Sequence, residues 1–225
     1  MKRTGFAAAV LVRLLAPVMV CLLAVGCDDS PPNGDRNDND DDGNVPVIVA
    51  MGDSITEGSE IRGPSYPEIL GERIGFAVYN EGVGGHSSVR VAGLLDDAFR
   101  YYHPNYVLIM CGTIDVWWTE RYDDVIGSLD YMVQYARENG ATPVVATIAP
   151  RYSDDRYLED LHTELNRRIR RFASDVGVYL VDVERAFRGR PDLIQDDGVH
   201  PTDEGTAVIA DLFFDALVAL GVVTP

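Results

Sequence analysis

The stretch Val45–Met51 (VPVIVAM), followed at once by Gly52–Thr56 (GDSIT), decides how the rest of the chain is interpreted. Its apolar part is typical of a strand that is buried on both faces of a parallel sheet. Glycine ends the run, and a serine just past the carboxyl end of such a strand lies where α/β sheets place their chemistry. Alone, however, a serine at this point serves equally well as the cap of a following helix or turn.

A second segment, Asp197–His200 (DGVH), supplies the groups that such a serine would need. An aspartate three residues before a histidine, with a glycine between them to permit a turn, can place its carboxylate on one imidazole nitrogen. The other nitrogen is then free to take a proton from a hydroxyl group. Ser54, Asp197 and His200 are therefore the candidate nucleophile, orienting acid and general base, with Asp196 as a competitor for the role of the acid.

On these segments the chain resembles the SGNH hydrolases, also called GDSL esterases and lipases. Gly52–Thr56 is similar to the family's nucleophile block, Asn80–Gly85 to its second block, Gly112–Asp115 to its third and Asp197–His200 to its fifth. The similarity extends over roughly residues 45–222. It implies a three-layer α/β/α fold of the flavodoxin-like type, with a parallel sheet of about five strands. It also implies ester hydrolysis by the serine without a cofactor, and the family's D-x-x-H spacing favours the second of the two adjacent aspartates as the acid.

The resemblance further assigns an oxyanion hole, from which one donor is missing. The backbone N–H groups of Ser54 and Gly85 would bind the oxyanion, but Ile114 stands where the family has an asparagine side chain. A slow enzyme, a donor supplied by a neighbour such as Thr113 or His86, or a change from catalysis to binding would each account for this. We favour a working hydrolase with an altered oxyanion hole.

Composition limits the partners and the chemistry. The chain has 225 residues and a formal net charge of −17, with no visible basic patch, so nucleic acid is not expected as a partner. The four histidines are scattered, and we therefore expect no metal site and no cofactor. Cys111 is expected to be a small buried core residue, without a partner for a disulfide within the folded domain.

The N-terminus has the features of an export signal. Lys2 and Arg3 precede an apolar region, Leu14–Val25, that is too short for a comfortable membrane span. Leu23–Cys27 (LAVGC) resembles a bacterial lipobox, in which Cys27 would be lipidated. We expect a lipoprotein signal peptide at 1–26 and localisation to the bacterial cell envelope through a lipid anchor in the membrane. An ordinary secretory signal that happens to contain a cysteine is the alternative.

Two further regions complete the expected domain organisation. Residues 27–44 are rich in Asp, Asn, Pro and Gly and are expected to form an acidic disordered tether, although Asp38–Gly43 resembles the start of a calcium loop. Residues 45–225 are expected to form the single hydrolase domain. Apolar runs predict its strands near 45–51, 76–79, 106–111, 143–148 and 178–181, with helices between them and a last helix over 202–220.

The sequence leaves two classes of function open. The first hypothesis is an exported serine esterase that hydrolyses acyl or acetyl esters, with a lipid, a small acyl ester or an acetylated carbohydrate as substrate. The second is a noncatalytic lipid- or glycan-binding lipoprotein on the same fold. His86, Trp117 and Trp118 are possible substrate contacts, since they follow the second and third blocks. The two tryptophans could line an acyl site, stack on a sugar ring or simply pack.

Overall fold

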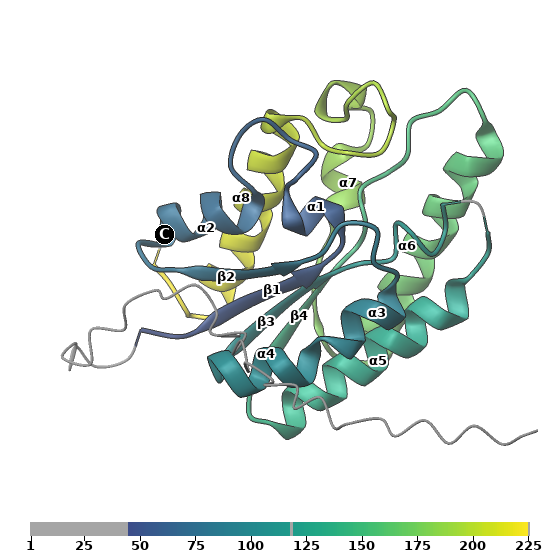
Figure 1. The fold of residues 1–225 in the computed structure, drawn as a ribbon. Coiled ribbons are helices and arrows are strands. Elements are labelled where there is room, and N and C mark those ends of the chain that lie inside the picture. Colours follow the sequence, from purple (N-terminus) through teal and green to yellow (C-terminus); the bar gives the residue numbers. More distant parts are fainter. Residues whose placement is uncertain (1–44, 118, 225) are drawn as a thin grey trace, which may run out of the picture. The chain divides into compact units, whose positions relative to one another are not determined.

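A parallel five-stranded sheet forms the centre of the molecule (Figure 1), and the computed structural model describes residues 45–117 and 119–224 of the chain. The strands occur in the order β2-β1-β3-β4-β5, which is the flavodoxin-like order. The predicted three-layer α/β/α fold is confirmed. The strands are β1 (Ile48–Gly52), β2 (Val78–Gly82), β3 (Tyr106–Met110), β4 (Thr142–Ala146) and β5 (Tyr179–Val181).

Helices cover both faces of this sheet (Figure 1). Helices α3 to α6 pack on one face, and α1, α2, α7 and α8 pack on the other. The helices are α1 (Ser54–Glu57), α2 (Tyr66–Ile74), α3 (Ser88–Gly93), α4 (Leu95–Tyr102), α5 (Tyr122–Glu138), α6 (Arg156–Val176), α7 (Val183–Phe187) and α8 (Asp203–Ala219), with a 3-10 turn at Pro191–Leu193.

The central strands alternate between the two cores. Val49 and Ile109 point into the core beneath α3 to α6, whereas Ile48 and Leu108 point into the core beneath α2 and α8. All four side chains are completely buried. Burial on both faces explains why these strands are continuous apolar runs in the sequence, and it fixes the carboxyl ends of β1 and β3 rigidly beside each other.

The strand limits differ from the predicted ones, most clearly at β2. Residues 45–47 do not join β1, and β2 starts at Val78 and continues through Gly82, so that the prediction of 76–79 was wrong at both ends. β2 lies at an edge of the sheet, where Tyr79 and Asn80 are exposed, and hydrophobicity is therefore a poor signal. Asn80 is suited to this position because its amide donates to Thr56 O at 2.8 Å and its oxygen accepts from Gly82 N at 2.9 Å.

Several predictions fall on residues outside the described part of the chain. The signal peptide at 1–26, the tether at 27–44 with its calcium-loop similarity, the lipidation site Cys27 and the substrate contact Trp118 all lie there. Within residues 45–117 and 119–224, no helix is both long enough and apolar enough to cross a membrane.

Candidate active site

The nucleophile segment crosses from β1 into α1 through a very tight turn. A Cβ atom on Gly52 would lie 2.0 Å from Thr56 Oγ1 and 2.5 Å from Met110 O, so only glycine fits there. Asp53 is the N-cap of α1, and its carboxylate accepts a hydrogen bond from Ile55 N at 3.1 Å. Ser54 is thus the first residue of the helix and not its cap, which leaves its hydroxyl free for another partner.

The structure brings Ser54, His200 and Asp197 together. Ser54 Oγ lies 2.9 Å from His200 Nε2, and His200 Nδ1 lies 2.6 Å from Asp197 Oδ2. Because a carboxylate only accepts hydrogen bonds, Nδ1 must carry the donated hydrogen. In the neutral ring Nε2 is then the acceptor, and it can receive the hydroxyl hydrogen of Ser54.

The segment that carries the acid and the base is held by its own backbone. Asp197 Oδ1 accepts from Val199 N at 2.8 Å and from His200 N at 3.0 Å. Partial burial opposes ionisation of Asp197, but the hydrogen bonds from His200 and the Val199 amide outweigh it and lower the pKa of this carboxyl. Asp196 and Asp197 are both exposed, and the carboxylate that contacts His200 is that of Asp197.

Asp53 is a second carboxyl close to the nucleophile, in a quite different environment. Its side chain is completely buried, and this burial raises its pKa from 3.8 to about 6, against the opposing effects of the Ile55 amide, Thr113 and His200. The sequence did not mark Asp53 as more than part of a motif. Its burial follows from its place at the end of β1, below the active-site surface.

The residues on the oxyanion side lie on two neighbouring loops. Gly85 follows β2 and has a φ of 74°, a value that glycine adopts without strain. Ile114 lies half-buried in the turn after β3, and the preceding Thr113 is buried beside Asp53. His86 is half-buried, with its Nδ1 atom unpartnered among the described residues.

An aromatic and cationic pair follows the third block. The Arg151 guanidinium lies over the Trp117 ring, 4.9 Å from its centroid, and donates to Trp117 O at 3.3 Å. Asp197 is near enough to act electrostatically on Arg151. Sequence reasoning missed Arg151, because it comes from the loop after β4, where the chain has no recognisable motif.

The neighbouring Tyr152 was missed for the same reason, and it supports the base. Its backbone N–H donates to Gly198 O at 2.9 Å, between Asp197 and His200. Gly198 has a φ of 75°, and a Cβ atom there would lie 2.0 Å from Tyr152 O. The Tyr152 hydroxyl donates to Phe187 O at 2.7 Å, which ties this loop to α7.

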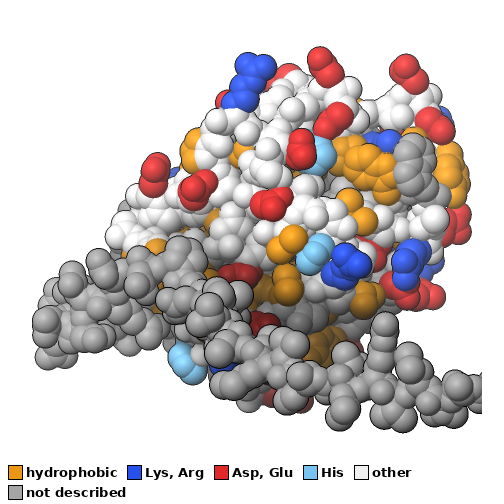
Figure 2. Space-filling view, viewed as in Figure 1, with side chains coloured by type: hydrophobic (Ala, Val, Ile, Leu, Met, Phe, Trp, Pro, Cys, Tyr) orange, Lys and Arg blue, Asp and Glu red, His pale blue; other side chains and the backbone are white. Residues whose placement is uncertain are grey.

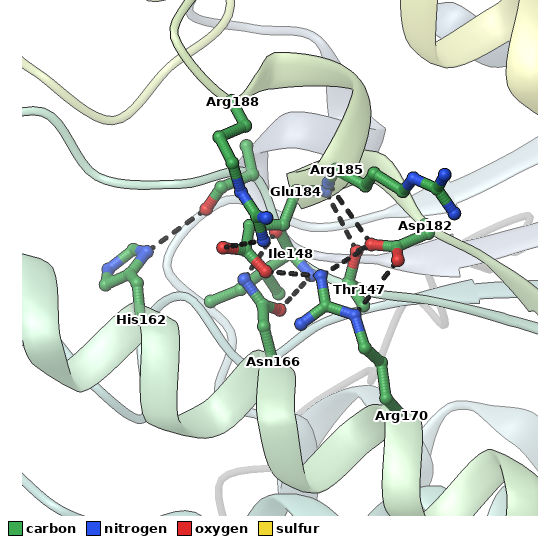
Figure 3. A network of polar contacts seen from close by, with 10 residues as sticks. Thr147, Ile148, His162, Asn166, Arg170, Asp182, Glu184, Arg185 and Arg188 are labelled. Atoms are coloured by element: carbon green, nitrogen blue, oxygen red, sulfur yellow. Dashed lines mark hydrogen bonds and ion pairs between the residues drawn. The ribbon is translucent and has the colours of Figure 1, made fainter.

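A polar network holds the start of the same loop against α6 (Figure 3). Asn166 clamps Ile148, accepting from its N–H and donating to its carbonyl, both at 2.9 Å. His162 Nδ1 lies 3.2 Å from Ala149 O, and burial lowers the pKa of His162 to about 4, so the ring is neutral and Nδ1 donates. Further along α6, Arg170 pairs with Asp182 and Glu184, which follow β5.

On the face shown in Figure 2, acidic side chains are spread widely, and hydrophobic side chains lie among them. Within residues 45–117 and 119–224, no cluster of three or more His, Cys, Asp or Glu side chains is suitable for holding a metal ion. Cys111 is a buried free thiol, and burial raises its pKa.

Comparison with known proteins agrees with this fold. The GDSL-like Lipase/Acylhydrolase family matches residues 50–208, and the chain belongs to this family of hydrolases. Among curated proteins none matches the chain. A lipase/acylhydrolase from Enterococcus faecalis is similar in structure, with a TM-score of 0.70 and 20% identity over 78% of this chain and 96% of the other.

Esterases are among the similar structures. A carbohydrate esterase family 3 protein from Talaromyces cellulolyticus has a TM-score of 0.64 and 25% identity over 77% of this chain and 97% of its own. A catalytic mutant of an acetylxylan esterase from Geobacillus stearothermophilus has a TM-score of 0.65 and 19% identity over 76% of this chain and 93% of its own. These likenesses support the predicted SGNH fold.

Proposed function

We propose that this protein is a serine esterase that hydrolyses acyl or acetyl esters. The observation that carries the proposal is the continuous line of hydrogen bonds from Ser54 through His200 to Asp197. The contacts suit the reaction, since Asp197 can hold the imidazole tautomer that accepts from the serine while it donates to the carboxylate. A binding protein would have no use for a base placed 2.9 Å from a serine hydroxyl.

The geometry gives each residue a defined step. Ser54 Oγ attacks the ester carbonyl carbon as His200 Nε2 takes its proton, and Asp197 stabilises the resulting imidazolium. The backbone N–H groups of Ser54 and Gly85 are the proposed donors to the oxyanion. When the intermediate collapses, His200 returns its proton to the leaving alcohol. Water activated by the same imidazole then hydrolyses the acyl-enzyme and regenerates Ser54.

The oxyanion hole differs from the usual family arrangement in one donor. Ile114 offers no hydrogen-bond donor, and one such donor typically contributes about 10²–10³-fold to turnover. We propose that the enzyme works with two backbone donors, at a rate limited by this loss. We propose small acyl groups as the preferred substrates.

An acetylated carbohydrate is the alternative substrate class. Two of the similar structures are named as carbohydrate or acetylxylan esterases. Trp117 offers an aromatic side chain near the third block, and Arg151 stacked on it adds hydrogen-bond donors. Such a pair suits the hydroxyl groups and ring face of a sugar better than a long acyl chain.

A substrate series tests the function and the substrate class together. Aryl esters of increasing acyl length are compared with acetylated xylan, whose acetyl groups are esters, using wild type and Ser54→Ala. Among the aryl esters, we expect Ser54-dependent hydrolysis to be fastest on the acetate. If the alternative substrate class is right, the acetylated glycan is hydrolysed faster than any aryl ester. Binding of a lipid or glycan without any Ser54-dependent hydrolysis would instead establish the noncatalytic lipoprotein.

We also propose that the enzyme is exported and lipidated at Cys27, which anchors it to a membrane of the bacterial cell envelope. The sequence similarity of Leu23–Cys27 to a lipobox supports this. Mass spectrometry of the mature N-terminus from the native host is the test. An acylated Cys27 is expected, and an unmodified N-terminus at another residue would refute the anchor.

A further inference from the structure

We infer that Asp115 is a positioning residue, which holds the Gly85 loop in place through Ser88 so that the Gly85 N–H faces the oxyanion. The inference rests on the proposed function. It assigns a role in this chain to the last residue of the third block, whose preceding position, Ile114, cannot take the usual part.

The loop from β2 to α3 is attached to the rest of the site at its two ends. At the first end, Val83 N donates to Gly52 O at 3.1 Å, just before the nucleophile. At the second end, Ser88 donates twice to Asp115, from its backbone N–H to Oδ2 at 2.7 Å and from its hydroxyl to Oδ1 at 2.9 Å. Gly85 is exposed and lies between these anchors, in a turn closed by His86 N, which donates to Val83 O at 3.2 Å, so the anchors set where that turn lies.

The second anchor is unusual because it consists of a buried carboxylate. Asp115 is 2% exposed and Ser88 is completely buried. Burial raises the pKa of Asp115, and the two hydrogen bonds from Ser88 oppose this rise by favouring the charged form. A buried charge is costly and contributes little net stability, whereas two charge-assisted bonds on one residue define its position closely. Accurate placement of the Gly85 loop would explain why a buried carboxylate is kept at position 115.

Placement matters more in this chain because the oxyanion hole has few donors. A side-chain donor at position 114 would bind the oxyanion from the β3 side, but isoleucine leaves that side without one. The N–H of Gly85 must then act with that of Ser54 alone. A displacement of about 1 Å in a catalytic group can cost on the order of 10²-fold in rate. The Asp115–Ser88 contact joins the β3 turn to the Gly85 loop and limits that displacement.

The test combines loop mobility with kinetics in the full-length protein. Asp115→Ala and Ser88→Ala remove the anchor wholly or in part, and Asp115→Asn is the conservative variant, which can still accept from the Ser88 N–H and donate to its hydroxyl. Ser128→Ala is the matched control, because the buried Ser128 hydroxyl bonds to Asp124 O within α5 at 2.7 Å. Hydrogen exchange of residues 83–88 and the kcat and KM for an aryl acetate are measured for each variant.

Asp115→Ala is expected to speed exchange in residues 83–88 and to lower kcat by about 10–100-fold with KM nearly unchanged, since the oxyanion contact exists only in the transition state. Asp115→Asn should recover most of this loss, and Ser128→Ala should change neither readout. Unchanged exchange, or faster exchange with full kcat, would overturn the inference. If wild type shows no Ser54-dependent hydrolysis, the proposed function and the catalytic role of the anchor both fall. Hydrogen exchange of residues 83–88 then tests only whether Asp115 holds the Gly85 loop in place.

Discussion

The proposed nucleophile and the proposed base are held in opposite ways. Ser54 belongs to a segment buried between two strands and a helix, and its immediate neighbour Asp53 is completely buried. His200 and Asp197 belong to a surface loop, which is shaped by bonds within itself and by the backbone of Tyr152. The core therefore fixes one half of the proposed machinery, whereas loop contacts fix the other. A change that disturbs how the first half is held should cost stability, and a change that disturbs how the second half is held should cost activity.

The largest effect should come from removing either reacting group. Ser54→Ala and His200→Ala should each lower kcat for an aryl acetate by about 10⁴–10⁶-fold, and the double variant should be little worse, because the two groups act as a unit. Steady-state kinetics on the three variants measures this. Independent, multiplying losses would show that Ser54 and His200 do not act together.

The acid should matter next, and its neighbour should not. Asp197→Asn breaks the preference for the required imidazole tautomer and should lower kcat by up to about 10⁴-fold while the fold remains intact. Asp196→Asn is the matched control, since this exposed neighbour should change kcat by less than about twofold. A greater loss in Asp196→Asn than in Asp197→Asn would mean that the acid has been assigned wrongly.

Two glycine substitutions separate the two halves. Gly52→Ala places a Cβ atom 2.0 Å from Thr56 Oγ1 within the core and should destabilise the protein by about 3 kcal/mol or more. Gly198→Ala places one 2.0 Å from Tyr152 O on the loop and should lower kcat by about 10²-fold. Thermal melting and kinetics of both variants provide the comparison. Loss of stability in Gly198→Ala as large as in Gly52→Ala would remove the distinction between the halves.

The buried Asp53 predicts how stability depends on pH. Its pKa is raised from 3.8 to about 6, so the folded protein binds a proton that the unfolded chain has already lost between these values. The contribution of protonated Asp53 to the free energy of unfolding is complete below about pH 4. It is lost as the pH rises through 6, which lowers the free energy of unfolding by about 2–3 kcal/mol. Asp53→Asn should therefore gain stability relative to wild type across this range in denaturant titrations. A difference that is constant with pH would argue against a protonated Asp53.

A smaller effect is expected where the oxyanion hole lacks a donor. Ile114→Asn should raise kcat on an aryl acetate, by no more than about tenfold, because an amide without supporting contacts is held loosely. Melting temperatures measured alongside kcat exclude a loss of folding as the cause of any decrease. A folded variant with unchanged or lower kcat would mean that another group already supplies the donor.

The sequence predicted the fold well because β1, β3 and β4 are buried on both faces and so form apolar runs. It placed the edge strand β2 poorly, since the exposed Tyr79 and Asn80 carry no such signal. Local spacing was sufficient to bring Asp197 to His200. No sequence pattern indicated Arg151 and Tyr152, or the link from Asp115 to Ser88, because these contacts depend on how separate loops meet at one edge of the sheet.

Covalent labelling by an aryl or alkyl fluorophosphonate tests most directly whether Ser54 is a nucleophile activated by His200. The reagent reacts with an activated serine and leaves a stable adduct that peptide mass spectrometry locates. We expect one adduct, on Ser54, that is absent in Ser54→Ala and is formed far more slowly in His200→Ala and Asp197→Asn. No adduct on Ser54 in the folded wild-type protein, or labelling at the same rate in His200→Ala, would contradict this account.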